Sequence, residues 1–297
     1  MQEFEYSGKA MGTDYHVAVV CGSRAIADEA YGIAKSTIQA YEARFSRFLP
    51  RSELSVLNES KDMVVSDTFL DVTLKALRLF EETRGVFNPL VQIARFGYNR
   101  DFAELVDTGG HDETPYDIDF SSTSVDQAAS RVRLGLGQRL DYGGFLKGYL
   151  AQIIAEKVEA YSRDISGVVV NIGGDIHARG ADEEGREFVF YIYNPITKKE
   201  DLSVVLRNQS LATSGTYKRQ WMHAGKSTHH ILGASGVPNE GSGVVSASVI
   251  CEDGGRAEAY AKVFLLLGPE EAAKLLGLEG VSFVTINKDG EVTKNIV

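Results

Sequence analysis

Apolar side chains recur at helical spacing more clearly in one segment of this chain than anywhere else. Over residues 67–84 they return every three to four positions, which predicts an amphipathic helix. Its apolar face would consist of Leu70, Thr73, Leu77 and Phe80. Ser66 or Asp67 is suited to cap the first turn, because a short oxygen-bearing side chain can accept a backbone N–H there, and Gly85 is suited to end the helix.

Three further segments have a helical composition with a weaker period. They are 24–45, 145–161 and 256–268. The last one, RAEAYAKVFLLLG, is strongly apolar except for a few charges, and its Glu258 and Lys262 are spaced to share one face. Exposed Glu–Lys pairs on helices are common and contribute little to stability. The segment by itself therefore does not show whether these two charges have a function.

Short runs rich in β-branched and aromatic residues predict strands of hairpin length. They are 13–20, 167–172, 188–194, 202–206, 211–221, 243–250 and 281–287. Because helices and strands occur in separate clusters instead of alternating, we expect an α+β fold with largely antiparallel sheets, not a doubly wound parallel sheet.

Two segments lack a regular pattern. Residues 46–58 are typical of a loop, because polar and proline residues interrupt the apolar positions. The interrupting residues are Pro50, Ser52 and Asn58. Residues 100–130 are acidic and weakly patterned, so we expect an irregular excursion there, followed by a strand or hairpin near 131–141.

Composition narrows the range of functions. The 297 residues are enough for one large domain or two ordinary ones. Lysine and arginine number 31 against 41 acidic residues, a net charge of -10 without any basic run, which argues against nucleic acid as a main partner. The two cysteines, Cys21 and Cys251, are far apart and lie next to β-rich runs, so we expect two buried thiols and no disulfide framework or zinc site.

Neither a membrane span nor a leader is indicated by the residues present. The first residues, MQEFEYSGKAMG, carry acidic groups where a signal peptide would be basic, and HVAVVCGS lacks the small residues that precede a lipoprotein cysteine. No run approaches the ~20 apolar residues that cross a bilayer. We therefore expect a cytoplasmic protein, although a chain trimmed of an export signal would look the same.

The segment LDYGGFLKGYLAQ places an acid, two glycines and a lysine at the start of a helix. These are Asp141, Gly143, Gly144 and Lys147. Adjacent glycines let a ligand approach the backbone, a helix N-terminus offers free N–H groups, and the lysine adds positive charge, which suits a phosphate or pyrophosphate. The alternative is a glycine-rich turn with a solvated lysine.

Two other segments combine glycines with polar side chains. In VVVNIGGDIHARG, Gly173 and Gly174 by themselves indicate a tight turn or bulge as readily as a site. LATSGTY and THHILGASG concentrate hydroxyl groups, glycines and His230, and a loop histidine can act as a general base near neutral pH. Since His229 is its neighbour, at most one of the two would face a site on a strand.

Taken in order, these segments resemble the ApbE-like flavin transferases, which are FAD:protein FMN transferases. The matching motifs are MGTDYHV at 11–17, SRFLPRSELSVLN at 46–58, GVFNP at 85–89, LDYGGFLKGY at 140–149, VNIGGDI at 170–176, LATSGTY at 211–217 and HHILGASG at 229–236, and the helix RAEAYAKVFLLLG closes the set. The resemblance implies one T-fold-like domain over 1–297, with antiparallel sheets flanked by helices and an FAD cleft between the sheet regions.

The resemblance also implies which residues would bind FAD. Met11 would lie against the flavin ring, Phe48 would be a second aromatic contact unless it belongs to the core, and Lys147 would lie near the pyrophosphate. The full implied set is Met11, Gly12, Thr13, Phe48, Asp141, Gly143, Gly144, Lys147, Gly173, Gly174, Thr213, Ser214, Gly215, His230, Ile231 and Lys262.

The implied reaction moves FMN from FAD to a Thr or Ser hydroxyl of a flavoprotein and releases AMP. Mg²⁺ would polarise the pyrophosphate, His230 would take the proton from the hydroxyl, and Lys147 would assist as a second catalytic residue. Some relatives use water as the acceptor and hydrolyse FAD to FMN and AMP.

This sequence departs from the family pattern where the metal would bind. The family has Asp and Thr on the closing helix as ligands, with a backbone carbonyl from the position of Gly144, whereas this chain has Glu258 and Lys262. Glu can still offer oxygen, but an ammonium has no lone pair to give. The remaining departures are Gly233 and Ala234 in place of an acidic motif, and Gln152 in place of Asp.

These departures remove negative charge and add positive charge around the expected metal. We therefore interpret Lys262, paired with Glu258, as placing its ammonium where Mg²⁺ would be, which makes transfer slower or abolishes it. Three alternatives remain open. The protein is an active transferase with an unusual metal site, an impaired relative that holds or hydrolyses FAD, or a non-enzymatic interaction protein on the same fold.

Overall fold

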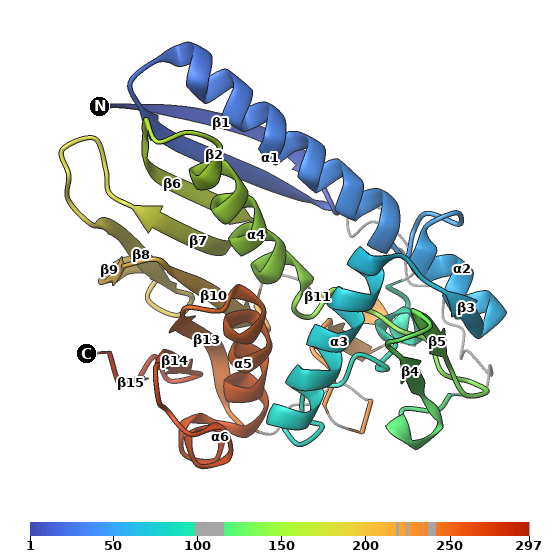
Figure 1. The fold of residues 1–297 in the computed structure, drawn as a ribbon. Helices are drawn as coiled ribbons and strands as arrows, with labels where there is room; N and C mark the ends of the chain where they lie inside the picture. Colours follow the sequence, from blue (N-terminus) through green and yellow to red (C-terminus); the bar gives the residue numbers. More distant parts are fainter. Residues whose placement is uncertain (99–115, 218–219, 224–225, 234, 237–241, 297) are drawn as a thin grey trace. The chain divides into compact units, whose positions relative to one another are not determined.

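The computed structural model describes residues 1–98, 116–217, 220–223, 226–233, 235–236 and 242–296 (Figure 1). The chain forms two compact units. The first consists of Met1–Tyr41, Phe145–Gly215 and Ser242–Val297, and the second of Glu42–Gly144 and Thr216–Gly241. The single domain expected over 1–297 stays a prediction.

The first unit is built on an eight-stranded sheet whose neighbouring strands all pair antiparallel. In spatial order the strands are β1 (Gln2–Ala10), β2 (Thr13–Cys21), β6 (Ile165–Ile172), β7 (Asp175–Gly180), β10 (Gln209–Gly215), β13 (Val244–Cys251), β14 (Ser282–Asn287) and β15 (Val292–Lys294). Together with the helices, this confirms the α+β class with mainly antiparallel sheets.

Helices line one face of this sheet. They are α1 (Arg24–Phe45, whose last residues belong to the second unit), α4 (Leu146–Tyr161) and α5 (Gly254–Leu267), and the short α6 (Pro269–Leu276) packs against α5. α4 packs on β6 and β7, α5 packs on β10 and β13, and the two helices contact each other (Figure 1). Most residues of α5 are buried, because a helix that is apolar on most of its sides packs into a core.

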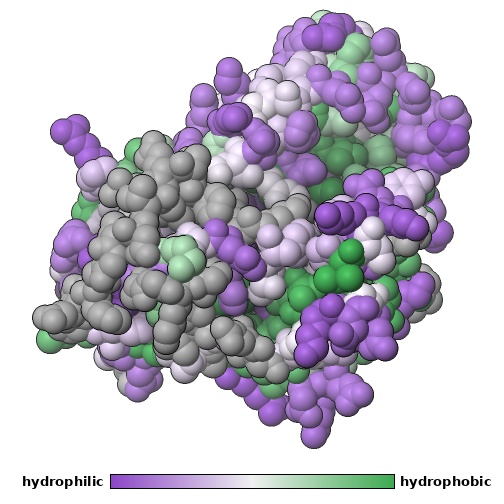
Figure 2. Space-filling model, turned by 180° about the vertical axis from the view of Figure 1, so that it is seen from behind, coloured by the Kyte–Doolittle hydropathy of each residue, from purple (hydrophilic) through white to green (hydrophobic). Residues whose placement is uncertain are grey.

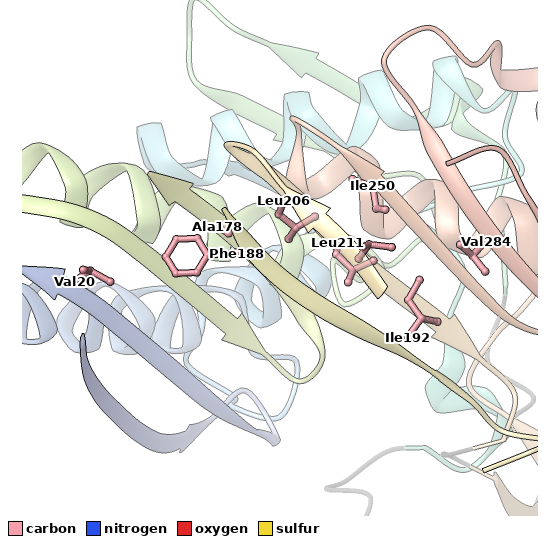
Figure 3. Close-up of a cluster of buried hydrophobic side chains, with 9 residues drawn as sticks. Val20, Ala178, Phe188, Ile192, Leu206, Leu211, Ile250 and Val284 are labelled. Carbon is pink, nitrogen blue, oxygen red and sulfur yellow. The ribbon is translucent and has the colours of Figure 1, made fainter. Parts of the chain in front are cut away.

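A two-stranded ribbon, β8 (Phe188–Asn194) and β9 (Lys199–Leu206), packs on the same sheet and encloses a separate apolar cluster (Figure 3). The buried members of this cluster are Val20, Ala178, Phe188, Ile192, Val204, Leu206, Leu211, Ile250 and Val284. Alternate residues of β6 point to opposite faces, so Val169 packs against this cluster while its neighbours Val168 and Val170 are buried on the other side.

The second unit is smaller and more irregular. Its elements are α2 (Glu53–Ser60), β3 (Asp62–Val64), α3 (Asp67–Glu82), η1 (Ile93–Phe96), η3 (Phe120–Ser122), β4 (Ser124–Asp126), β5 (Arg131–Arg133), β11 (Gln220–His223) and β12 (Lys226–His229). The clearest sequence prediction, a helix over 67–84, is confirmed by α3. Ser66 is its N-cap, with Oγ accepting the Phe69 N–H at 3.3 Å, and Gly85 follows at φ 81°.

The loop prediction for 46–58 is wrong in its second half. Ser52 does not interrupt a pattern there, because its Oγ accepts the Ser55 N–H at 3.0 Å and caps α2. Asn58 is buried and exchanges two hydrogen bonds with the backbone of Leu140, at 2.9 and 2.7 Å. In the sequence alone, a polar side chain that hydrogen-bonds a distant backbone segment cannot be told from a loop residue.

Other expectations have mixed outcomes. Of 131–141 only β5 is a strand, and the first part of the irregular excursion, 100–115, lies outside the described residues. Strand β1 was not predicted, although from Phe4 onward its more buried residues alternate with exposed ones, because only Phe4 is fully buried and small residues make the alternation weak. Cys21 and Cys251 are buried free thiols, as expected.

The visible surface is largely polar. Most of the coloured surface on the face shown in Figure 2 is hydrophilic, with smaller hydrophobic areas between. Among the described residues, the helices are too short or too polar to cross a bilayer.

Candidate functional site

Two tight turns that were singled out in the sequence have the same backbone conformation. Met11 and Gly12 connect β1 to β2 with φ of 53° and 67°, and Gly173 and Gly174 connect β6 to β7 with φ of 68° and 102°. A two-residue hairpin loop with two positive φ values is the turn that matches strand twist, and glycine adopts it without strain.

The strand pairing brings these two turns side by side. The Gly173 N–H donates to the Asp14 carbonyl at 3.0 Å, and a Cβ atom at Gly173 would lie 2.8 Å from Thr13 Oγ1. Gly173 therefore has two reasons to be glycine, its positive φ and the closeness of Thr13. Since β2 and β6 are sheet neighbours, segments far apart in the sequence meet at one end of the sheet.

The third predicted segment, Thr213 to Gly215, reaches the same end of the sheet. β10 is antiparallel to β7, so its last residues lie at the end where the Gly173–Gly174 turn begins β7. Thr213 Oγ1 hydrogen-bonds Ser248 Oγ, on the neighbouring strand β13, at 2.8 Å, and Ser214 is buried. Three of the predicted cofactor segments are thus gathered at one sheet end.

Four charged side chains form a buried cluster, called the ion cluster from here on: Lys147, Asp175, Glu258 and Lys262. Lys147, in the first turn of α4, places Nζ 2.8 Å from Asp175 Oδ2 and also contacts Glu258 Oε1. Its side chain is 17% exposed, so it is not the solvated lysine of the alternative interpretation. Asp175 directly follows the Gly173–Gly174 turn, so the cluster lies next to that turn in the chain.

Glu258 lies at the centre of the ion cluster. Its Oε2 accepts the Gly148 N–H at 2.9 Å, while Oε1 contacts Lys147 and also Lys262 Nζ, the latter at 3.2 Å. Lys262 Nζ also lies 3.4 Å from the Glu258 carbonyl oxygen. The pair is therefore not an ordinary surface salt bridge.

The electrostatics of the ion cluster follow from burial and pairing. Burial favours the neutral form of Glu258, but the ammonium groups of Lys147 and Lys262 and the Gly148 N–H together hold the pKa of its carboxyl far below the usual range. Burial works against the charge of Lys147 too, yet Asp175 and Glu258 raise its pKa. Burial and the Glu258 charge raise the pKa of Asp175, and burial lowers that of Lys262.

Close approach of two helices makes the Gly148–Glu258 hydrogen bond possible. A Cβ at Gly148 would clash with the Gly254 carbonyl, and a Cβ at Gly254 would clash with the Gly148 carbonyl. Gln152, one of the departures from the family pattern, accepts the Gly254 N–H through Oε1 at 2.8 Å and so helps to cap α5. Sequence reasoning missed Asp175, Gly148 and Gly254, although each stands inside or beside a motif it did use.

The remaining predicted residues belong to the second unit. They are Phe48, Asp141, Gly143, Gly144, His230 and Ile231. Asp141 Oδ1 accepts the Gly143 N–H at 2.9 Å, and its Oδ2 lies 3.4 Å from Arg47 Nε. Gly144 follows in the turn that precedes α4.

Phe48 is 41% exposed, so its alternative interpretation as a core residue is wrong. The Arg47 guanidinium carbon lies 4.3 Å from the centre of the Phe48 ring and 4.9 Å from that of Tyr98. Ile231 is buried and His230 is partly exposed. Gly233, where the family acid is missing, is buried, and Ala234 after it lies outside the described residues.

The residues of the ion cluster do not fit a magnesium ion as they stand. Both oxygens of Glu258 already accept from Lys147, Lys262 or Gly148, and the ammonium of Lys262 offers no lone pair. Within the part of the chain that the structure describes, no group of three or more His, Cys, Asp or Glu side chains is arranged to hold a metal ion. Gly144 and Glu258 as metal ligands therefore find no support here.

Known proteins share the sequence pattern and the fold of this chain. A curated FAD:protein FMN transferase of Salmonella typhimurium is 25% identical over 304 residues, covering 96% of this chain and 84% of that protein. One from Haemophilus influenzae is 26% identical over 314 residues, covering 97% and 88%. The crystal structure of the ApbE protein of Thermotoga maritima has the same fold, with a TM-score of 0.85 at 22% identity over 99% of this chain and 97% of that one. A model described as the ApbE family matches residues 11–284, so this chain belongs to the ApbE family, as its motifs predicted.

Proposed function

We propose that this protein binds FAD and transfers its FMN part to a Thr or Ser hydroxyl of a flavoprotein acceptor, with release of AMP. The observation that carries the proposal is the ion cluster beside the Gly173–Gly174 turn, because buried lysines next to open backbone turns suit a pyrophosphate. The names of the curated relatives from two organisms support the same activity.

Roles for individual residues follow from their chemistry. Lys147 and Lys262 would donate hydrogen bonds to the pyrophosphate, and the Met11 thioether and the exposed part of the Phe48 ring would contact the flavin. The remaining proposed contacts would come from backbone and small polar groups. These are Gly12, Thr13, Asp141, Gly143, Gly144, Gly173, Gly174, Thr213, Ser214, Gly215 and Ile231.

In the proposed reaction, His230 takes the proton from the acceptor hydroxyl. The freed oxygen attacks the phosphorus of the FMN half, a new P–O bond forms, and the P–O bond to the AMP half breaks. AMP leaves with the bonding electrons, while Lys147 and Lys262 offset the negative charge that develops on the phosphate oxygens. A water molecule in place of the hydroxyl would give FMN and AMP instead.

Binding and chemistry can be tested on purified, flavin-free protein. Calorimetric titration with FAD measures binding. Incubation with FAD and an acceptor subunit of a redox protein that carries covalent FMN, followed by chromatography, measures labelling and AMP. We expect one AMP released per labelled acceptor, and no label on an acceptor whose target Thr is replaced by Val.

The role of His230 has a matched control on an exposed strand position. His230→Ala should slow labelling by about 10²- to 10⁴-fold, the usual contribution of a positioned general base, whereas His16→Ala should leave it unchanged. Labelling that survives His230→Ala would remove this residue from the mechanism. Absence of FAD binding would refute the proposed function and favour an interaction protein.

A second candidate function is supported by the misfit to magnesium. A protein that holds FAD without transferring FMN would need the pyrophosphate contacts but no strong Lewis acid, and the ion cluster supplies the former only. In that case FAD binds, no AMP is released with either acceptor or water, and intact FAD is recovered after the protein is denatured.

A further inference from the structure

We propose that the ion cluster replaces a divalent cation in this protein, with Lys262 supplying the positive charge that meets the FAD pyrophosphate, so that FAD binding needs no metal. This inference rests on the proposed function, because it names how FAD would be held. It starts from the disagreement between the residues present and a magnesium site.

Within the ion cluster, the cations are more accessible than the carboxylates. The side chains of Lys147 and Lys262 are 17% and 18% exposed, whereas those of Asp175 and Glu258 are 6% and 2% exposed. The carboxylates therefore lie beneath and the ammonium groups lie toward the accessible side. An anion that approached the cluster would meet the cations first.

Both lysines of the ion cluster keep a hydrogen-bond donor for a further acceptor. Each ammonium group has three N–H donors. In the described part of the chain Lys147 contacts Asp175 and Glu258, and Lys262 contacts the carboxylate and the carbonyl of Glu258. Each lysine thus has a donor left for an external acceptor, and a pyrophosphate offers several oxygens at the spacing of two neighbouring cations.

The four charges of the ion cluster balance one another. Two lysines and two carboxylates sum to zero, so a divalent cation added to the intact cluster would face two ammonium groups with no net negative charge to attract it. Without Lys262 the remaining three groups carry a net charge of minus one, centred on a buried glutamate. That arrangement would attract a cation, and a hydroxyl at position 262 would add an oxygen ligand.

The inference predicts a simple pattern of FAD affinities. We would titrate FAD into the wild type, Lys262→Thr, Lys262→Arg and the control Lys157→Thr, each in excess EDTA and in saturating MgCl₂. Lys157 is exposed on α4, so its substitution makes the same change away from the cluster. The wild type and the control should bind FAD with the same Kd in both buffers, within about twofold.

The two variants at position 262 should behave differently. Lys262→Thr should bind about tenfold or more weakly in EDTA, the size of a lost charge-assisted hydrogen bond, and should recover in MgCl₂. Lys262→Arg keeps the charge and should stay independent of metal. Circular dichroism on each variant, together with the Arg variant, separates a lost contact from a lost fold.

Several outcomes would overturn the inference. Wild-type affinity for FAD that rises more than tenfold with MgCl₂ would show that the cluster admits a metal after all. Equal affinity of Lys262→Thr and the wild type in EDTA would show that Lys262 does not meet the ligand.

A parallel titration with inorganic pyrophosphate separates this inference from the proposed function. Binding of pyrophosphate that depends on Lys262, without any binding of FAD, would refute the proposed function and retain the cluster as a metal-independent anion site. Binding of FAD that requires Mg²⁺ would refute the inference and retain the function. Absence of binding for both probes would refute both.

Discussion

Replacing Gly148 by alanine tests the packing that holds the ion cluster together. Gly148 lies where α4 and α5 come closest, and its N–H is one of the donors to the buried Glu258. A Cβ there would lie 2.3 Å from the Gly254 carbonyl oxygen and 3.2 Å from Glu258 Cβ. Ordinary contacts of a Cβ atom begin near 3.4 Å, so the two helices must separate by roughly 1 Å.

The magnitude follows from three effects. Overpacking a tight contact costs about 1–3 kcal/mol. Lengthening the Gly148 N–H bond to a charged acceptor costs up to about 1.5–3 kcal/mol. Alanine recovers about 1 kcal/mol through its better helix propensity. The net loss in the free energy of unfolding is about 2–4 kcal/mol, which corresponds to a fall in Tm of roughly 3–7 °C for a chain of this size.

Gly32→Ala is the matched control for this change. Gly32 lies inside α1 and is exposed, and a Cβ added there would meet no neighbouring atom within 4 Å. The same substitution there should raise stability by about 0.5–1 kcal/mol through helix propensity alone.

Urea denaturation followed by circular dichroism gives the free energy of unfolding for both variants, and calorimetry gives Tm. If Gly148→Ala proves as stable as the wild type while Gly32→Ala behaves as expected, then α4 and α5 are not in close contact at this glycine, and the support it gives to Glu258 is refuted.

Three further outcomes are expected. Glu258→Gln leaves two buried ammonium groups facing one carboxylate, so it should lower the free energy of unfolding by about 3–5 kcal/mol in urea titrations, whereas Glu156→Gln on the exposed side of α4 should change it little. Burial lowers the pKa of His177 to about 4. The stability that its neutral form contributes is therefore complete above the unfolded pKa near 6.5 and is lost as pH falls toward 4. His177→Gln should remove about 3 kcal/mol from the pH dependence of the free energy of unfolding, and an unchanged pH dependence would contradict the assignment. Ser52→Ala removes the N-cap of α2 and should cost about 1 kcal/mol by calorimetry, with a smaller loss for Ser52→Gly.

The sequence predicted elements best where the signal is local. The α3 helix was predicted because its period, its Ser66 cap and the glycine after it all lie within one segment. The α2 helix was missed because it is short and its buried Asn58 is polar, so that its place depends on a bond to the distant Leu140 backbone. The edge strand β1 was missed because only Phe4 on its inner face is fully buried, and the small Gly8 and Ala10 make its alternation weak in the sequence.

The sequence by itself determined the α+β class, the order of the family motifs, the glycine turns and the departures at positions 258 and 262. These depend on residue type and short spacing, which are visible along the chain. Only the tertiary structure decided that Lys147, Asp175, Glu258 and Lys262 form one neutral cluster with its cations outward. The partners of Glu258 at Lys147 and Gly148 are 111 and 110 positions away, and they meet it only because two glycines let α4 approach α5 on the same sheet. A contact of that kind is a property of helix packing and strand order, and residue spacing does not contain it.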